Sequence, residues 1–359
     1  SACGRYTLAY NGELYNFRQL ASILKPPPRT RCDTEVVLRQ CILRGPQALN
    51  DFDAIWALAF VDAAQRCGHL SRDPIGVKPL YYAVHDGRLI FASEMPAMRC
   101  VPDLPAEIDT DALRLYLLLG FIPHPWTIYR HVRKLPPGHR LDFDAAGPRE
   151  PVRFFQLPPR PETPPSYEDA CRLVRHTVEA AVVRQRIADV PLGAFLSGGL
   201  DSSIVVAALA RTGGTVRTFT IGYADHPRYD ETRHAQTVAE HFHTDHHAYR
   251  LGFTDVLDAV EPMLNHLGEP FADSSLLPAA MVSRYTRRHV TVALSGDGGD
   301  ELFGGYWRYL GHEYLRRYRR LPAPLRRGLI EPLLRLAPQA RTTPLLDRLR
   351  QMRKLLRGD

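Results

Sequence analysis

The sequence predicts two domains of different class: an α+β domain over residues 1–150 and a doubly wound α/β domain over 167–359, joined by a linker over 151–166. Three observations carry this prediction. A chain of 359 residues is long enough for about two domains. Strand signals dominate the first part, and strands and helices alternate in the second. Between them lies a cluster of prolines, typical of a stiff extended connection, at positions 158, 159, 161, 164 and 165.

The first domain carries the signals of an antiparallel sheet. Residues 5–10 alternate in polarity, which is the period of a half-buried strand. Two further strand-like segments, 81–84 and 88–92, flank Asp86 and Gly87. An Asp-Gly pair in that position is typical of a type I′ hairpin. We therefore expect antiparallel strands in this part of the chain.

The second domain begins with a helix and then alternates strand and helix. Ser166 and Asp169 form a capping-box-like start for a helix over 167–187. Further strands are expected at 190–196, 216–221, 245–250 and 290–294. Further helices are expected at 202–211, 231–242, 254–266 and 276–287. Folds of this kind bind ligands at the carboxyl ends of the strands.

Composition indicates an ordinary globular protein with packed cores. Hydrophobic residues make up 45% of the chain and charged residues 24%. The longest apolar runs, 55–61 and 115–122, are too short to span a bilayer. The start of the chain has no apolar signal-peptide region, and the six cysteines lack metal-binding spacing. We expect free thiols in a reducing compartment, and hence a cytoplasmic protein without a membrane partner.

The net charge of +7 is concentrated near the C-terminus. Residues 311–359 carry a net charge of +9, which leaves −2 for residues 1–310. Such a basic segment could contact nucleic acid. Because leucines recur between the arginines, we favour the solvated face of amphipathic helices, and a nucleic-acid partner is not expected.

The segment Ser197–Ser203, with the sequence SGGLDSS, is the most informative in the chain. It follows a buried strand and precedes a helix, so that glycines and free backbone N–H groups form a site for an anion. It lacks the lysine of the Walker A pattern, and such a cradle suits pyrophosphate. Asp201 could bind the accompanying Mg²⁺ or, alternatively, cap the helix.

A second loop repeats this pattern. Ser295–Glu301, with the sequence SGDGGDE, also follows an apolar strand, so the two loops are expected to face one crevice. Asp201 and Asp300 could then share one Mg²⁺ between pyrophosphate oxygens. The alternative is that Asp297 and Asp300 only form turns. The strand end at 218–222 offers backbone groups to an adenine edge.

Two motifs of the first domain carry chemistry. Asn11 and Gly12 offer a side-chain amide and a backbone N–H, the two donors of an oxyanion hole. On their own, however, they read more readily as a simple Asn-Gly turn. Asp33 precedes a helix, where it could bind an ammonium group or act as the N-cap.

Together these motifs resemble the glutamine-dependent asparagine synthetase family over nearly the whole chain. The matching segments are NGELYN at 11–16, DTEVV at 33–37, SRDPIGVKPLYY at 71–82, FASE at 91–94, KLPPGH at 134–139, DVPLGAFLSGGLDSS at 189–203, FTIGY at 219–223 and SGDGGDELFGGY at 295–306. The resemblance implies an N-terminal-nucleophile-hydrolase-type glutaminase domain followed by an ATP-pyrophosphatase-type synthetase domain.

The resemblance also implies roles for individual residues. Asn11 and Gly12 would form the glutaminase oxyanion hole, while Glu13 and Asp33 would contact glutamine. Residues 268–275 would line the acceptor side. ATP contacts are implied for Leu196, Ser197, Gly198, Gly199, Leu200, Asp201, Ser202, Ser203, Ile221, Ser295 and Gly296, and Mg²⁺ ligands for Asp201 and Asp300.

The chain departs from the family pattern at both ends. The family's nucleophilic cysteine lies several tens of residues before the NGE motif, whereas Cys3 lies just ahead of the strand that leads to Asn11. A strand rises about 3.3 Å per residue and cannot fold Cys3 back onto its own far end. The C-terminus stops before the family's late lysine. We therefore expect an internal fragment that does not hydrolyse glutamine by itself.

The implied reaction of the parent protein is the ATP-dependent amidation of aspartate through an aspartyl-adenylate, with ammonia from glutamine and release of AMP and pyrophosphate. The alternative within the family is amidation of another carboxylate in surface-polymer or secondary metabolism. A β-lactam-forming enzyme would not need the NGE and DTE motifs, and an RNA-modifying ATP-pyrophosphatase would not need residues 1–150. The intact glycine loops count against a catalytically silent sensor. The expected partners are glutamine, aspartate and ATP, and a homodimer stays open.

Overall fold

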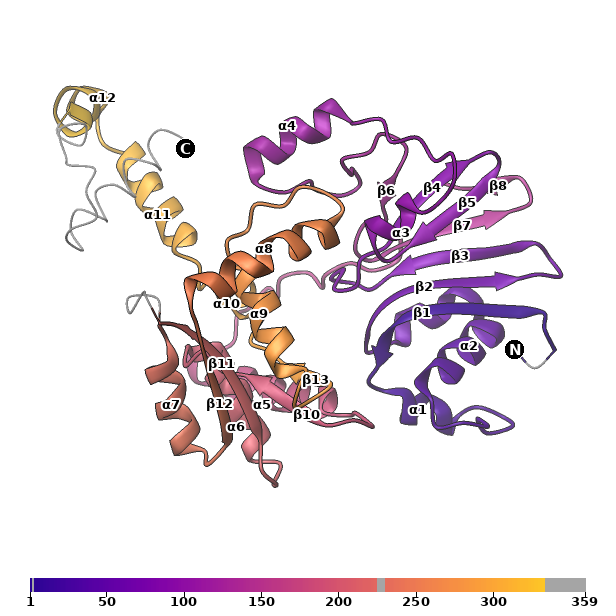
Figure 1. Ribbon diagram of the computed structural model, residues 1–359, viewed down its shortest axis with the longest axis horizontal. Coiled ribbons are helices and arrows are strands. Elements are labelled where there is room, and N and C mark those ends of the chain that lie inside the picture. The colour runs from indigo at the N-terminus through magenta and orange to yellow at the C-terminus, as the bar shows by residue number, and fades with distance from the viewer. Residues whose placement is uncertain (2, 225–229, 333–359) are drawn as a thin grey trace.

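The computed structural model describes residues 1, 3–224 and 230–332 of the chain, and Figure 1 shows two sheet-based domains. The first domain is built on a six-stranded antiparallel sheet in the order β1-β2-β3-β7-β8, with β9 paired to β7. Its strands are β1 (Tyr6–Leu14), β2 (Ala54–Asp62), β3 (Cys67–Arg72), β7 (His139–Asp144), β8 (Gly147–Pro148) and β9 (Val152–Arg153).

A smaller sheet and five helical segments complete this domain. The smaller sheet has the order β5-β4-β6, with β4 (Tyr81–His85), β5 (Arg88–Ala92) and β6 (Arg133–Lys134). The helices are α1 (Phe17–Ser22), α2 (Asp33–Arg44), a 3₁₀ turn (Gly45–Asp51), α3 (Met95–Arg99) and α4 (Thr110–Leu119). The hairpin prediction is confirmed, because Asp86 and Gly87 both have positive φ, at 49° and 71°.

Strand β2 explains how the first domain holds together. Trp56, Leu58 and Phe60 belong to the core shared with α1 and α2, whereas Ala57 and Ala59 belong to a second core on the other face. Successive side chains of a strand point to opposite faces, so a strand buried on both faces becomes nearly continuously apolar. The larger sheet is therefore covered by helices below and by the smaller sheet above (Figure 1).

The second domain has a four-stranded parallel sheet in the order β12-β11-β10-β13. Its elements are α5 (Tyr167–Gln185), β10 (Leu192–Phe195), α6 (Leu200–Ala210), β11 (Arg217–Tyr223), α7 (Thr232–His241), β12 (Asp245–Leu251), α8 (Phe253–Leu267), α9 (Leu276–Thr286) and β13 (Val292–Leu294). After them come α10 (Gly299–Phe303), α11 (Trp307–Arg319), α12 (Ala323–Leu325) and a π-helical turn (Arg326–Ile330).

The expected helices and strands of this domain are all present, and each begins and ends within a few residues of the predicted positions. The capping prediction for α5 is confirmed, since Ser166 Oγ accepts a hydrogen bond from the Asp169 N–H at 3.1 Å. The predicted linker needs one correction. Strand β9 lies within 151–166 and pairs with β7, and Phe154 stacks on Trp56 with ring centroids 6.1 Å apart. The first sheet therefore extends past residue 150.

The strand order places the ligand edge of the second domain. Strands β11 and β12 follow β10 on one side, whereas β13 pairs with the other side of β10. The order therefore reverses between β10 and β13. In open α/β sheets, ligands bind outside the carboxyl ends of the strands at such a switch point. The loops after β10 and β13 are the two glycine-rich loops singled out above.

Two further expectations concern surfaces. Within residues 1, 3–224 and 230–332, no helix has the length and apolarity that crossing a bilayer requires. The basic segment 311–359 is only partly described, because residues 333–359 lie outside the described residues. In α11, Arg316 and Arg317 both pair with Glu313, which suits the solvated-helix interpretation.

Candidate functional site

The loop after β10 is organised by its own hydroxyl groups. Ser202 Oγ lies 3.0 Å from Ser197 Oγ and donates to the Gly199 carbonyl at 3.2 Å. Ser203 Oγ donates to the same carbonyl at 2.7 Å, and the Gly199 N–H donates to Ser197 Oγ at 3.2 Å. The three serines therefore fix the loop conformation before any ligand binds.

Gly198 is a position in this loop that requires glycine. Its φ of 80° is in the left-handed region, where a Cβ is unfavourable. A Cβ there would also come within 2.5 Å of the backbone of His234 and Ala235 in α7. The loop can lie this close to α7 only because the side chain is absent.

Helix α6 begins without a side-chain cap. Gly199 is its N-cap and offers no side chain to the first amides of the helix. The alternative that Asp201 caps the helix is therefore wrong, because Asp201 is the second helical residue. Uncapped N–H groups at a helix start attract an anion, and the helix dipole adds to this. The start of α6 therefore has the uncapped backbone N–H groups that the predicted anion site requires.

The loop after β13 packs directly on this helix start. A Cβ on Gly296 would lie 2.8 Å from the Ser202 nitrogen, and a Cβ on Gly299 would lie 2.5 Å from the Asp201 carboxyl carbon. The half-buried Asp201 carboxylate thus lies between the two loops. Ser295 Oγ donates to Asp297 at 2.9 Å and ties the second loop internally.

Asp300 occupies a different place from Asp201. It lies in the first turn of α10, and a Cβ on Gly305, just past the end of that helix, would lie 1.9 Å from Asp300 Oδ1. In the part of the chain that the structure describes, no group of three or more His, Cys, Asp or Glu side chains could hold a metal ion. Mg²⁺ is commonly held by one or two carboxylates together with phosphate oxygens. The Asp201 carboxylate beside an anion site fits that donor set.

The remaining predicted nucleotide contacts flank the loops. Leu196 is buried, and its N–H donates to the Phe219 carbonyl at 2.8 Å. Ile221 is half-buried near the carboxyl end of β11, opposite Tyr249 of β12. Both lie at the same edge of the sheet as the glycine-rich loops.

In the first domain, the turn interpretation of Asn11 and Gly12 is wrong. Both residues lie inside β1, opposite Ala57 and Trp56 of β2. The Leu14 N–H donates to the Asp33 side chain at 3.0 Å, so this N–H points away from β2, toward the outer edge of β1. Because backbone groups alternate in direction along a strand, the Gly12 N–H points to the same outer edge. The Asn11 amide donates to Ser93 Oγ at 3.0 Å.

Glu13 and Asp33 both lie next to this edge. Cys32 is the N-cap of α2, so the alternative that Asp33 caps the helix is wrong. The pKa of Glu13 is raised, first by burial and then by the nearby Asp33 and Asp189, while Lys78 acts in the opposite direction. The four residues assigned to glutamine by resemblance are therefore brought together.

Cys3 is far from that group. It lies in a turn before β1, and the strand from Tyr6 to Asn11 spans roughly 17 Å at 3.3 Å per residue. A hydrogen bond with Ser1 is the main cause of the lowered pKa of its thiol, which is exposed. The expectation that Cys3 does not reach the oxyanion donors is confirmed.

Residue-level reasoning from the sequence missed several neighbours of these sites. Ser93 contacts Asn11, and Gly299 and Gly305 lie against the two predicted metal ligands. It also missed the ion pair between Lys134 and Glu269, which joins the two domains. Apart from Gly305, which lies five residues from Asp300, these contacts have no local signal, because each joins segments that are distant in the sequence.

Comparison with known proteins matches both halves of the chain. Residues 1–154 match the model of the glutamine amidotransferase domain, and residues 173–358 match that of asparagine synthase. The chain is 37% identical over 327 residues to a putative asparagine synthetase [glutamine-hydrolyzing] 2 of Methanocaldococcus jannaschii, which covers 89% of this chain and 62% of that protein.

Two bacterial relatives give the same result. A putative asparagine synthetase [glutamine-hydrolyzing] of Mycobacterium tuberculosis is 34% identical, with 90% of this chain and 51% of that protein covered. Asparagine synthetase [glutamine-hydrolyzing] 1 of Bacillus subtilis is 30% identical, with 96% and 54% covered. The chain thus spans about half to three fifths of the length of these relatives. With a glutamine amidotransferase domain followed by an asparagine synthase domain, the chain belongs to the asparagine synthetase family.

Proposed function

We propose that the protein containing this chain amidates aspartate to asparagine at the expense of ATP, with glutamine as the source of ammonia. The observation that carries this proposal is the pair of glycine-rich loops at the switch point between β10 and β13, with the Asp201 carboxylate between them. A backbone anion site beside a carboxylate suits a nucleotide whose pyrophosphate leaves with a metal ion.

In the proposed first step, an oxygen of the aspartate side chain attacks the α-phosphorus of ATP. The bond between the α-phosphorus and the bridging oxygen breaks, and pyrophosphate leaves with its negative charge. The N–H groups at the start of α6 would hold that charge, and the serines of 197–203 would keep them in place. Mg²⁺ would be held by Asp201, with Asp300 as a second ligand, and would neutralise charge on the pyrophosphate when bound.

In the second step, ammonia attacks the acyl carbon of the aspartyl-adenylate, AMP leaves, and the nitrogen loses a proton. Glutamine would supply the ammonia at the first domain, where Asn11 and the Gly12 N–H would stabilise the oxyanion and Glu13 and Asp33 would contact the substrate. Leu196, Ile221, Ser295 and Gly296 would contact the rest of the nucleotide. We propose residues 1–154, which include β9, and residues 167–359 as the two catalytic domains, and the cytoplasm as the location.

The test uses the intact protein with Mg·ATP and aspartate, with and without ammonium, and follows pyrophosphate, AMP and asparagine. Aspartate-dependent pyrophosphate release and asparagine formation on adding ammonium are the expected results. If pyrophosphate is released only with a different carboxylate, the mechanism is retained and the substrate is replaced. The alternative of amidation in surface-polymer or secondary metabolism would then apply. No release with any carboxylate would contradict the proposal.

A further inference from the structure

One short segment of the second domain is held by the first domain at three points. This segment, 268–272, is the first part of the connection between α8 and α9. A Cβ on Gly268 would lie 2.8 Å from side-chain atoms of both Met95 and Pro96 in α3, so the Gly268 backbone packs directly against these side chains. Glu269 pairs with Lys134 of β6, and the Ala272 N–H donates to the Gly120 carbonyl, after α4, at 2.8 Å.

The position of segment 268–272 relates it to the ligand edge. Helix α9 follows the segment and leads into β13, so the helix runs antiparallel to that strand. Its N-terminal end, together with the segment, therefore lies toward the carboxyl edge of the parallel sheet. The loops 197–203 and 295–301 lie at the same edge.

Lys134 is the charged contact of this interface. Its Nζ lies 2.5 Å from Glu269 Oε1 and donates to the Ile122 carbonyl at 2.8 Å. Only 16% of the Lys134 side chain and 12% of the Glu269 side chain are exposed, so water screens the pair little. Tyr81, opposite Lys134 in the smaller sheet, has a pKa raised by burial and by the nearby Glu269.

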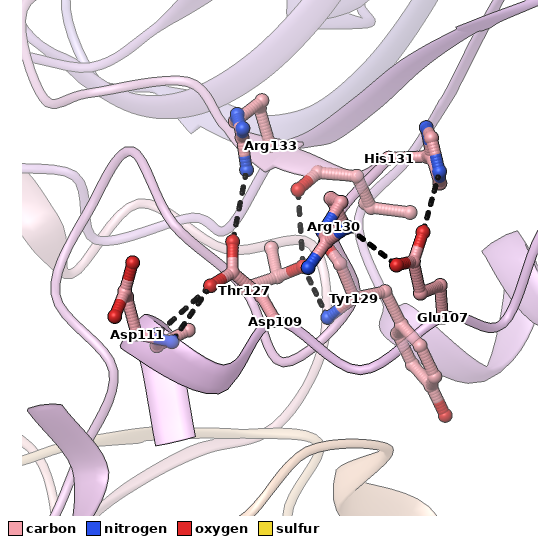
Figure 2. Close-up of polar contacts among 10 residues, drawn as sticks. Glu107, Asp109, Asp111, Thr127, Tyr129, Arg130, His131 and Arg133 are labelled. Carbon is pink, nitrogen blue, oxygen red and sulfur yellow. Dashed lines mark hydrogen bonds and ion pairs between the residues drawn. The ribbon is translucent and has the colours of Figure 1, made fainter. Parts of the chain in front are cut away.

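The segment that leads into the strand carrying Lys134 makes ion pairs with residues before α4 (Figure 2). Glu107 pairs with Arg130 and lies 3.3 Å from His131 Nε2, while Asp109 faces Arg133 at 4.0 Å. Asp109 also caps α4. The segment that leads to Lys134 is thus tied to residues 107–109 of the first domain.

We propose that Lys134 is a positioning residue for the second domain's reaction. Its ammonium group, held by the first domain, fixes Glu269 and segment 268–272 at the edge where the carboxylate substrate is activated. Docking of the first domain thereby completes the acceptor side of the second site. This inference rests on the proposed function for the identity of that site.

A second ion pair between the domains provides a matched control. Arg184 Nε lies 2.9 Å from Asp53 Oδ2, with 48% and 47% of the side chains exposed. Arg184 is in the last turn of α5, which precedes β10 and therefore ends near the amino edge of the sheet. This pair joins the same two domains but lies away from the ligand edge.

The experiment compares Lys134→Met, Lys134→Arg and Arg184→Met in the intact protein. Ammonium-driven pyrophosphate release is measured with aspartate and Mg·ATP, so that glutamine hydrolysis does not enter. Lys134→Met is expected to lower kcat/KM for aspartate by roughly 10- to 100-fold through misplacement of the acceptor side, with the KM for ATP little changed. Lys134→Arg should recover part of the loss, and Arg184→Met should stay within about twofold.

Hydrogen exchange provides a readout that does not depend on the reaction. The amides of 268–275 should exchange faster in Lys134→Met than in the unmodified protein, and at the unmodified rate in Arg184→Met. Lys134→Gln serves as a second variant if Lys134→Met does not fold. Equal exchange in all variants, or an equal loss of kcat/KM in Arg184→Met, would overturn the inference. Absence of aspartate-dependent release from the unmodified protein would instead refute the proposed function, and exchange would still decide the role of Lys134.

Discussion

Loop 197–203 of the second domain and the group around Asn11 in the first domain are built in opposite ways. In the second domain, loop 197–203 is held by hydrogen bonds among residues no more than five positions apart. In the first domain, Asn11 meets Ser93, and the Leu14 N–H meets Asp33, so the group exists only when the strand, a helix and a hairpin have assembled.

This difference decides what each site depends on. A loop held by local bonds and glycines fails when its own backbone is altered, because the bonds that shape it lie within the loop. A site made of distant residues fails when the surrounding sheet is weakened. The following changes test this difference, starting with the largest expected effect.

Asp201→Ala is expected to lower ammonium-driven pyrophosphate release at least ~100-fold, because it removes the carboxylate between the two loops while leaving the loop backbone intact. Asp258→Ala, on the exposed face of α8, is the matched control. The measurement is pyrophosphate release at saturating aspartate. Near-normal release by Asp201→Ala would show that this carboxylate is not the metal ligand.

Gly198→Ala should destabilise the chain by about 3 kcal/mol, since it combines the cost of a positive φ with a clash against α7. Gly213 has a φ of 83° and nothing within 4 Å of its Cβ position, so Gly213→Ala should cost only about 1 kcal/mol. Urea unfolding measures both. Equal losses would show that contact with α7 does not matter.

His69 in β3 should make the first domain sensitive to acid. Burial lowers its pKa to about 4 from 6.5, so the ring is neutral when folded and the unfolded chain binds more protons between these values. The contribution of the neutral His69 ring to the free energy of unfolding is fully present above pH 6.5. It is lost as the pH falls toward 4, by up to about 3 kcal/mol. Urea unfolding between pH 4 and 7.5 should show this slope.

The variant His69→Leu should flatten that slope, because it removes the buried ring that titrates. His241→Leu, at the exposed end of α7, should leave it unchanged. A slope that survives in His69→Leu would assign the acid sensitivity to other groups.

Asp33→Ala should cost about 1–3 kcal/mol, because it leaves the N–H of the fully buried Leu14 without its acceptor. Thr34→Ala removes a donor to the other oxygen of the same carboxylate and should cost less. Urea unfolding followed by tryptophan fluorescence compares the two. If Thr34→Ala were the more damaging change, the Leu14 contact would not be what holds Asp33.

The extent to which the sequence predicted each site follows from the same difference. The loop 197–203 and the strands around it were predictable because an apolar run, two glycines and a helix start are signals within a few residues of one another. The same local reasoning failed for Asn11 and Gly12. Their pairing with Ala57 and Trp56 makes them strand residues, and no signal near them shows that partner.

The contact between the domains was the least predictable. Lys134 was visible only as the start of a short motif, and Glu269 as one residue of a segment without assigned roles. Their pairing depends on β6 joining the smaller sheet and on α8 ending next to α3, at Gly268. Periodicity describes single elements, whereas such a contact depends on how whole elements dock.

The reversal of strand order between β10 and β13 has a consequence for how the molecule is made. The two glycine-rich loops at the nucleotide edge are separated along the chain by β11, β12 and the helices around them. During synthesis, loop 197–203 is made early, but loop 295–301 reaches its place only after β13 (Val292–Leu294) has paired with β10. Such long-range parallel pairing is slow. A nucleotide that contacts both loops would bind only the completed sheet, and would therefore favour its assembly during synthesis.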